Sequence, residues 1–168
     1  MDVNQFFQAT APHLHLLVAT PHQACDFAWS LQRTSDQQAV VRTLRGSKSR
    51  TAGQLFDEFA AALQFPYYFG ENWDALDECL ADLDWLPGAA YVLVFTNSQQ
   101  LLDREPAGQF ASLLDVLENA ARGWAQPQHR TPARTPRAFH VVFQCSSANE
   151  DAFLARLNDL GRSLNRLK

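Results

Sequence analysis

The sequence predicts an α/β fold in which a small parallel sheet is packed with helices. From Ala39 onward, the patterns follow in the order strand, helices, strand, helix, strand, helix, and this alternation is typical of parallel sheets covered by helices. Residues 91–95 are continuously apolar, as expected of a strand buried on both faces. With 168 residues, of which 46% are hydrophobic, the chain is long enough for one sizeable core.

Residues 1–38 are predicted to be an N-terminal extension that packs on a domain formed by residues 39–168. Two short apolar runs, 14–19 and 27–31, are separated by a Thr-Pro-His-Gln segment. We expect these runs to form a strand pair or an extension of the sheet edge.

The domain is expected to begin with a strand over residues 39–45, which alternate loosely in polarity. A helix should follow, because Thr51 and Gln54 have capping-box spacing and apolar residues recur at helical spacing as far as Leu63. Pro66 is expected to stop this helix.

The remaining elements alternate in the same way. Helical spacing predicts helices over residues 72–83 and 110–124, and residues 139–143 are predicted to be the third strand. A second capping-box pattern, Ser147 with Glu150, predicts a C-terminal helix whose apolar face reaches Leu164.

Charge is unevenly distributed along the chain. The 53 residues between Arg50 and Arg104 contain no Lys, Arg or His but nine acids, so this segment carries −9. The rest of the chain carries +5, which gives the net charge of −4. Residues 126–137 are rich in Pro and Arg, which predicts a stiff basic loop that is either a linker or a second contact.

The helix predicted over residues 72–84 separates its apolar and acidic side chains. At about 100° per residue, one arc is apolar, and it contains Ala75, Leu76, Cys79, Leu80 and Leu83. The opposing arc contains Asp74, Asp77, Glu78, Ala81 and Asp82, and Trp73 and Asp84 lie at the boundary. Because no cation on this helix neutralises these acids, we expect a basic partner to dock there. The same negative field disfavours direct binding of nucleic acid.

An aromatic segment precedes this helix. Tyr67, Tyr68, Phe69 and Trp73 cannot all point inward from a short loop, so we expect at least one of them to contact a partner. Cys79, on the apolar arc, is expected to be a buried small hydrophobe.

The segment from Tyr68 to Leu80 reads Tyr-Phe-Gly-Glu-Asn-Trp-Asp-Ala-Leu-Asp-Glu-Cys-Leu. It closely resembles the barstar family of intracellular ribonuclease inhibitors, whose pattern is Tyr-aromatic-Gly-Glu-Asn-x-Asp-Ala-Leu-x-acid-Cys-Leu. In outline, the resemblance extends from Ala39 to Cys145. It implies a three-stranded parallel sheet packed with helices, and inhibition by filling the nuclease active site.

The resemblance also implies a partner-binding site. The positions at which the family contacts its nuclease are occupied here by Tyr68, Asn72, Trp73, Asp74, Asp77, Glu78 and Ala81. Asp82 joins this site because it shares the acidic arc. Three residues depart from the family pattern: Glu78 replaces an Asp, Asp77 an aromatic residue and Trp73 an aliphatic one. The family also makes an acidic contact from the later helix, and the position here that aligns with it approximately is Asn119.

The sequence therefore predicts a protein inhibitor that occludes the basic active site of a ribonuclease, with no chemistry, cofactor or metal of its own. One alternative is a non-inhibitory protein-binding or regulatory module that grips another basic protein with the same face. Another is an enzyme that uses the carboxylates as acid and base or as metal ligands. The five His residues are scattered, and no phosphate-binding loop or nucleophile motif is present.

The composition indicates in which cellular compartment the protein is expected. No apolar run approaches the roughly 18 residues that a membrane span requires, and the N-terminus has no basic and apolar export signal. Cys25, Cys79 and Cys145 form neither a disulfide framework nor a paired metal site. We expect a cytoplasmic protein, monomeric when free, with no membrane contact.

Overall fold

The computed structural model describes residues 3–34, 38–127 and 134–167. Within them, five parallel strands form one sheet in the order β2-β3-β4-β1-β5. The strands are β1 (Leu14–Val18), β2 (Ala39–Arg45), β3 (Ala90–Thr96), β4 (Ala138–Cys145) and β5 (Asn165–Arg166). The α/β class and the parallel sheet are confirmed.

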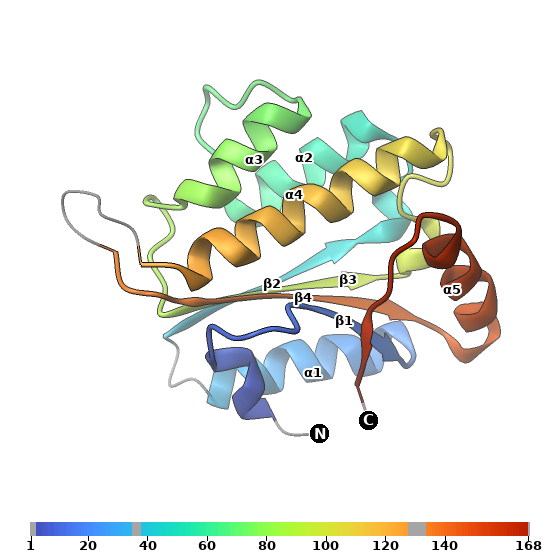
Figure 1. Ribbon diagram of the computed structural model, residues 1–168, viewed down its shortest axis with the longest axis horizontal. Helices are drawn as coiled ribbons and strands as arrows, with labels where there is room; N and C mark the ends of the chain where they lie inside the picture. The colour runs from blue at the N-terminus through green and yellow to red at the C-terminus, as the bar shows by residue number, and fades with distance from the viewer. Residues whose placement is uncertain (1–2, 35–37, 128–133, 168) are drawn as a thin grey trace.

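Helices cover both faces of the sheet. The helices are α1 (Pro21–Thr34), α2 (Ala52–Leu63), α3 (Trp73–Asp82), α4 (Ala107–Ala125) and α5 (Glu150–Asp159). Single 3₁₀ turns are η1 (Val3–Phe7), η2 (Gly46–Lys48), η3 (Ser98–Gln100) and η4 (Ser147–Asn149). Figure 1 shows α2, α3 and α4 over one face and α1 beneath the other.

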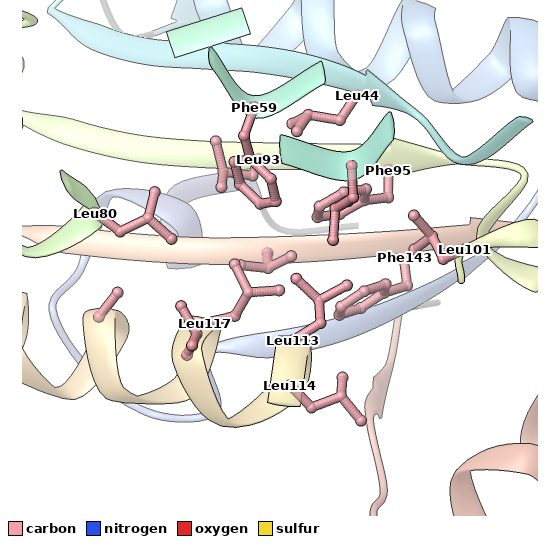
Figure 2. Close-up of a cluster of buried hydrophobic side chains, with 14 of the residues drawn as sticks. Leu44, Phe59, Leu80, Leu93, Phe95, Leu101, Leu113, Leu114, Leu117 and Phe143 are labelled. Atoms are coloured by element: carbon pink, nitrogen blue, oxygen red, sulfur yellow. The ribbon is translucent and has the colours of Figure 1, made fainter. Parts of the chain in front are cut away.

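Strand β3 divides its side chains between two hydrophobic clusters, one on each face. Tyr91, Leu93 and Phe95 join the larger cluster, beneath α2, α3 and α4, part of which is drawn in Figure 2. Val92 and Val94 join the smaller cluster with α1. Every residue of β3 is buried, so the prediction of a strand covered on both faces is confirmed.

The prediction of three strands is wrong, because the sheet has five. The N-terminal extension supplies β1, which pairs along its whole length with β4, from Leu14 opposite Val141 to Val18 opposite Cys145. Strand β5 has only two residues and pairs with β1. The extension therefore completes the sheet rather than forming a strand pair of its own.

The second apolar run of the extension is helical, which corrects the prediction of a strand over residues 27–31. Helix α1 begins with a capping box in which the Gln23 amide donates to Thr20 Oγ1 at 3.3 Å and the Thr20 amide donates to Gln23 Oε1 at 2.9 Å. Pro21 occupies the first helical position, where its missing N–H costs nothing. The segment expected to be a turn between strands is thus a helix start.

The predicted helix caps are only partly correct. Thr51 accepts the Gln54 amide, as expected, but Gln54 Oε1 accepts the Arg50 amide instead of that of Thr51. The capping box expected at the start of α5 is wrong, because its N-cap residue, Asn149, makes no side-chain cap bond. Helix α5 ends at Asp159, before Gly161 with φ +65°, so Leu164 lies outside it.

Buried histidines join β1, β4 and β5. His140 Nε2 donates to the Gln8 carbonyl at 2.9 Å, so its Nδ1 can accept from His15 Nε2 at 3.1 Å. His15 Nδ1 in turn accepts from Asn165 Nδ2 at 3.2 Å. This directed chain of hydrogen bonds requires neutral rings. Burial, reinforced by His140 and His13, lowers the pKa of His15 to about 3, and burial also lowers the pKa of His140.

Acid should therefore destabilise the fold through His15. An unfolded histidine gains a proton near pH 6.5, whereas folded His15 stays neutral until about pH 3, so stability is lost as pH falls between these values. The free energy of unfolding in urea should drop by about 1.4 kcal/mol per pH unit for each histidine that behaves this way.

The matched variants are His15→Gln, which should flatten this dependence, and His22→Gln on the exposed side of α1, which should leave it unchanged. An NMR titration of wild-type His15 provides a second measurement. A midpoint between pH 5 and pH 7 would contradict this account of the buried ring.

Candidate functional site

The start of α3 is fixed by a short polar turn. Asn72 is its N-cap residue and accepts the Ala75 amide through Oδ1 at 2.9 Å, while its Nδ2 donates to the Gly70 carbonyl at 3.1 Å. A Cβ at Gly70 would lie 3.1 Å from Asn72 Nδ2, closer than most Cβ contacts, so the Asn72 side chain would have to shift. Glu71, between them, has φ 50°. Asn72 therefore has a clear structural role in the predicted site.

The apolar arc of α3 packs on the core, as the helical pattern predicts. Leu76 and Leu80 are fully buried, and Cys79 is also buried. Burial, with the negative charges of Asp82 and Glu78, raises the pKa of the Cys79 thiol. A raised pKa makes the reactive thiolate scarcer, which agrees with the expectation that Cys79 is a small core residue.

The opposite arc lies on the surface, although its members are not equally exposed. Asp74, Glu78 and Ala81 are exposed, whereas Asp77 and Asp82 are half-buried. The predicted acidic residues are therefore brought together on one side of α3. Exposed Asn119, on α4, comes from the neighbouring helix.

Three of these acids form no ion pair with any residue that the structure describes. Among the described residues, no Lys, Arg or His forms an ion pair with Asp74, Asp77 or Glu78. Burial, with the charges of Asp74 and Glu78, raises the pKa of the Asp77 carboxyl. This face of α3 therefore carries like charges that would be stabilised by an external cation.

Other acids of the same sequence segment are already paired. Glu58 accepts two hydrogen bonds from the Arg45 guanidinium, at 2.8 and 2.9 Å, and a third from the Arg45 amide. Asp103 accepts two from Arg50, at 2.8 and 2.6 Å. The charge of −9 counted along the sequence therefore overstates what a partner would meet, whereas Asp74, Asp77 and Glu78 on α3 form no ion pair with the described residues.

Trp73 supports the site from its edge. Its indole Nε1 donates to Gln109 Oε1 on α4 at 2.8 Å, and its ring meets Phe56 edge-on, with centroids 5.1 Å apart. The residue is half-buried, which matches the boundary position expected from the helical pattern. Its donor group is already used inside the protein.

The aromatic segment before α3 divides between core and surface. Phe65 and Phe69 pack edge-on against each other and against the larger cluster. Tyr67 is fully exposed and Tyr68 is 63% exposed. Beside Tyr68, a hollow of about 140 Å³ is lined also by Glu78, Asp82 and Trp85. Tyr68 therefore borders the same hollow as two acids of α3, Glu78 and Asp82.

The family model described as Barstar (barnase inhibitor) matches residues 39–144, which is more than half of the chain. The chain belongs to the Barstar family.

Other comparisons add little. No curated protein matches this chain. One chain in a solved structure of Drosophila ORC bound to AT-rich DNA and Cdc6 has 16% sequence identity and a TM-score of 0.47. The alignment covers 96% of this chain and 49% of that one, so this chain spans about half its length. A likeness this weak says nothing about function.

The Barstar-matched region includes contacts that sequence reasoning missed, at the C-terminal end of α3. The Leu80 carbonyl accepts from Trp124 Nε1 at 2.7 Å, and the Ala81 carbonyl accepts from Arg134 Nη1 at 2.8 Å. The Arg134 guanidinium also lies 3.5 Å from the centroid of the Trp124 ring. Two side chains from outside α3 thus satisfy carbonyls that a helix end leaves unpaired.

Arg134 belongs to the segment predicted to be a basic loop, of which residues 128–133 lie outside the described residues. Arg137, in the same segment, donates to the Gly88 carbonyl at 2.9 Å. Both described arginines of this segment therefore bind the protein's own backbone. Sequence gave no signal for this pairing, since a helix end and a loop far along the chain carry no shared pattern.

The part of the chain that the structure describes offers neither a metal-binding cluster nor a membrane-spanning helix. No group of three or more His, Cys, Asp or Glu side chains there could hold a metal ion. None of its helices is long and apolar enough to cross a membrane.

Replacing Asn72 should weaken the fold before it affects any partner. Asn72→Ala removes the cap of α3 and should lower the free energy of unfolding by about 1 kcal/mol. Asn72→Asp keeps a side-chain acceptor for the Ala75 amide and should recover most of that loss. Urea unfolding of both variants checks this, and equal stability of Asn72→Ala and wild type would contradict a capping role.

Proposed function

We propose that this protein inhibits a ribonuclease by inserting the acidic face of α3 into the basic active site of that enzyme. The observation that carries the proposal is the set of carboxylates, Asp74, Asp77 and Glu78, that α3 presents without an ion pair among the described residues. Membership of the Barstar family, described as barnase inhibitor, supports the same function.

Electrostatic complementarity gives a physical reason for the pairing. A ribonuclease holds phosphate and stabilises transition-state charge with cationic side chains, so its active site attracts anions. Opposite fields speed the encounter of two proteins and fix their relative orientation. A helix face with several carboxylates therefore competes with the phosphates of RNA for the same cations.

The exposed tyrosines extend the proposed contact surface. Tyr68 has an apolar ring for packing and a hydroxyl for hydrogen bonding, a combination common at binding sites. The hollow beside it is bordered by Glu78 and Asp82, so a cationic side chain of the nuclease could lie between an aromatic wall and carboxylates. Trp73 would act mainly by holding the edge of this surface, because its Nε1 is bonded to Gln109.

Inhibition in this arrangement is occlusion. The inhibitor fills the cleft and excludes RNA, and no bond is made or broken. The partner is therefore expected to regain full activity when it is released.

Affinity capture tests the function directly. The full chain is immobilised, exposed to lysate and medium from its own cells, and eluted stepwise with salt. The proposal expects a basic protein whose ribonuclease activity is absent in the complex and returns on release. A captured basic protein without such activity would favour the non-inhibitory binding module.

Glu78 offers the sharpest mutational test. Glu78→Gln keeps the shape of the side chain but removes its charge, so affinity for the captured nuclease should fall by about tenfold or more. The free energy of unfolding should change little, because the side chain is exposed. Calorimetric titration at about 0.15 M salt, where the Debye length is about 8 Å, measures the affinity.

Asp151→Asn, which removes an exposed carboxylate from α5, is the matched control. It should alter affinity only slightly, since surface charge at a distance is screened. Equal losses in the two variants would show that net charge, and not the α3 face, governs binding.

A further inference from the structure

The basic segment of residues 126–137 returns to the protein where α3 and α4 end. Figure 1 shows the C-terminal ends of both helices at one end of the sheet, beside the start of β4. The Arg137 amide donates to the Trp124 carbonyl at 2.9 Å, and the Arg137 side chain donates to the Gly88 carbonyl at 2.9 Å. The described residues 134–137 are therefore tied to the end of α4 and to the loop before β3.

Trp124 connects this segment to α3. Its ring is fully buried and packs against Tyr91 of β3, with centroids 4.8 Å apart, and against the Arg134 guanidinium, which lies 3.5 Å from the ring centroid. The face of an aromatic ring attracts such a cation. These contacts hold the indole so that its Nε1 donates to the Leu80 carbonyl at 2.7 Å.

The last turn of α3 takes most of its closing bonds from outside the helix. Its own chain supplies one bond, from the Leu83 amide to the Cys79 carbonyl at 3.2 Å. The Leu80 carbonyl accepts from the buried indole, and the Ala81 carbonyl accepts from Arg134 Nη1 at 2.8 Å. Since carbonyls at a helix end have no partner within the helix, this turn depends on the two side chains.

The charges of the same turn oppose a helix end. Glu78 and Asp82 lie four residues apart, and both line the hollow beside Tyr68. Like charges at this spacing repel each other, and negative charge near the C-terminus of a helix is disfavoured by its dipole. Arg134 brings a cation to this end. The turn that carries these carboxylates is therefore held in part by Arg134.

Charge and support would give Arg134 opposite effects on the proposed complex. As a charge alone, it would repel the cations of a basic nuclease, so its removal would strengthen binding. As a support, its removal would weaken binding, because a frayed turn must be ordered again when the nuclease docks. The supporting contacts are short and half-buried, whereas repulsion across a wet surface is screened. Support should therefore outweigh repulsion.

We propose that Arg134 is a positioning residue of the inhibitory face, which holds the last turn of α3 so that Glu78 and Asp82 are ordered before a nuclease binds. Its effect on affinity rests on the proposed function, whereas its effect on α3 does not. The described arginines of the basic segment thus act within the protein, rather than as parts of a linker or a second contact.

Amide hydrogen exchange of the free chain tests the support itself. Arg134→Met removes the donors and the charge but keeps a long side chain, and it should raise the exchange rates of amides 79–83 by about tenfold. Arg134→Lys retains a donor for the Ala81 carbonyl and should restore part of the protection. Arg137→Met removes a charge and a backbone contact from the same segment, and as the matched control it should leave these amides unchanged. Equal protection in Arg134→Met and wild type would overturn the proposal.

Affinity for the captured nuclease tests the consequence. At about 0.15 M salt, Arg134→Met should bind about tenfold more weakly than wild type, Arg134→Lys should recover part of this loss, and Arg137→Met should bind like wild type. Urea unfolding of each variant confirms that it is folded under the titration conditions. Unchanged or tighter binding of Arg134→Met would overturn the positioning role.

Glu78→Gln separates this result from a failure of the proposed function. If Glu78→Gln weakens binding and Arg134→Met does not, the function stands and the role of Arg134 falls. If Glu78→Gln binds as tightly as wild type, the proposed function fails, and the link between Arg134 and affinity fails with it. The exchange measurement still decides whether Arg134 holds the end of α3.

Discussion

Repulsion among the carboxylates of α3 is the constraint on which the proposed binding surface depends, because a helix with such charges must be held from outside. Asn72 caps its start, and Leu80 lies in the core. At its end, where the helix dipole disfavours the negative charge of Asp82, Trp124 and Arg134 satisfy backbone carbonyls, and Arg134 brings a positive charge. The acids are thus displayed on a rigid element. A rigid surface loses little conformational freedom on binding, which favours affinity.

The local pattern of α3 was predictable because helical periodicity alone decides which side chains share a face. Trp73 was even placed at the correct boundary. The sequence also carries a signal for the start of α1, because Thr20 and Gln23 have capping-box spacing and Pro21 occupies the first helical position. The apolar run from Phe27, however, also fits a short strand, which is the wrong prediction. Short apolar runs do not separate strand from helix by periodicity. The error was therefore one of interpretation, whereas the signal was present.

Contacts between distant segments could not be predicted in this way. Strand β1 lies between β4 and the two-residue β5, and no pattern in a single sequence predicts which strands will pair. The outer edge of β2 is another example. Gln32, from α1, donates to the Ala39 carbonyl at 2.7 Å and accepts the Val41 amide at 3.2 Å, while Glu58 accepts the Arg45 amide. Side chains thus occupy backbone groups that an exposed edge would offer to another chain. This supports the expectation of a monomer, which stays a prediction.

Helix α4 is the fixed support of α3, because it holds the acidic helix near both ends. Gln109 accepts the indole N–H of Trp73 at the start of α3, and Trp124 donates to the Leu80 carbonyl near its end. The inward residues of α4, among them Leu117, are fully buried, and a close-packed core resists their displacement. The whole of α3 therefore cannot shift on the sheet without disturbing the core. What can vary is the order of its last turn, so the segment that follows α4 should decide how firmly the acids of that turn are held.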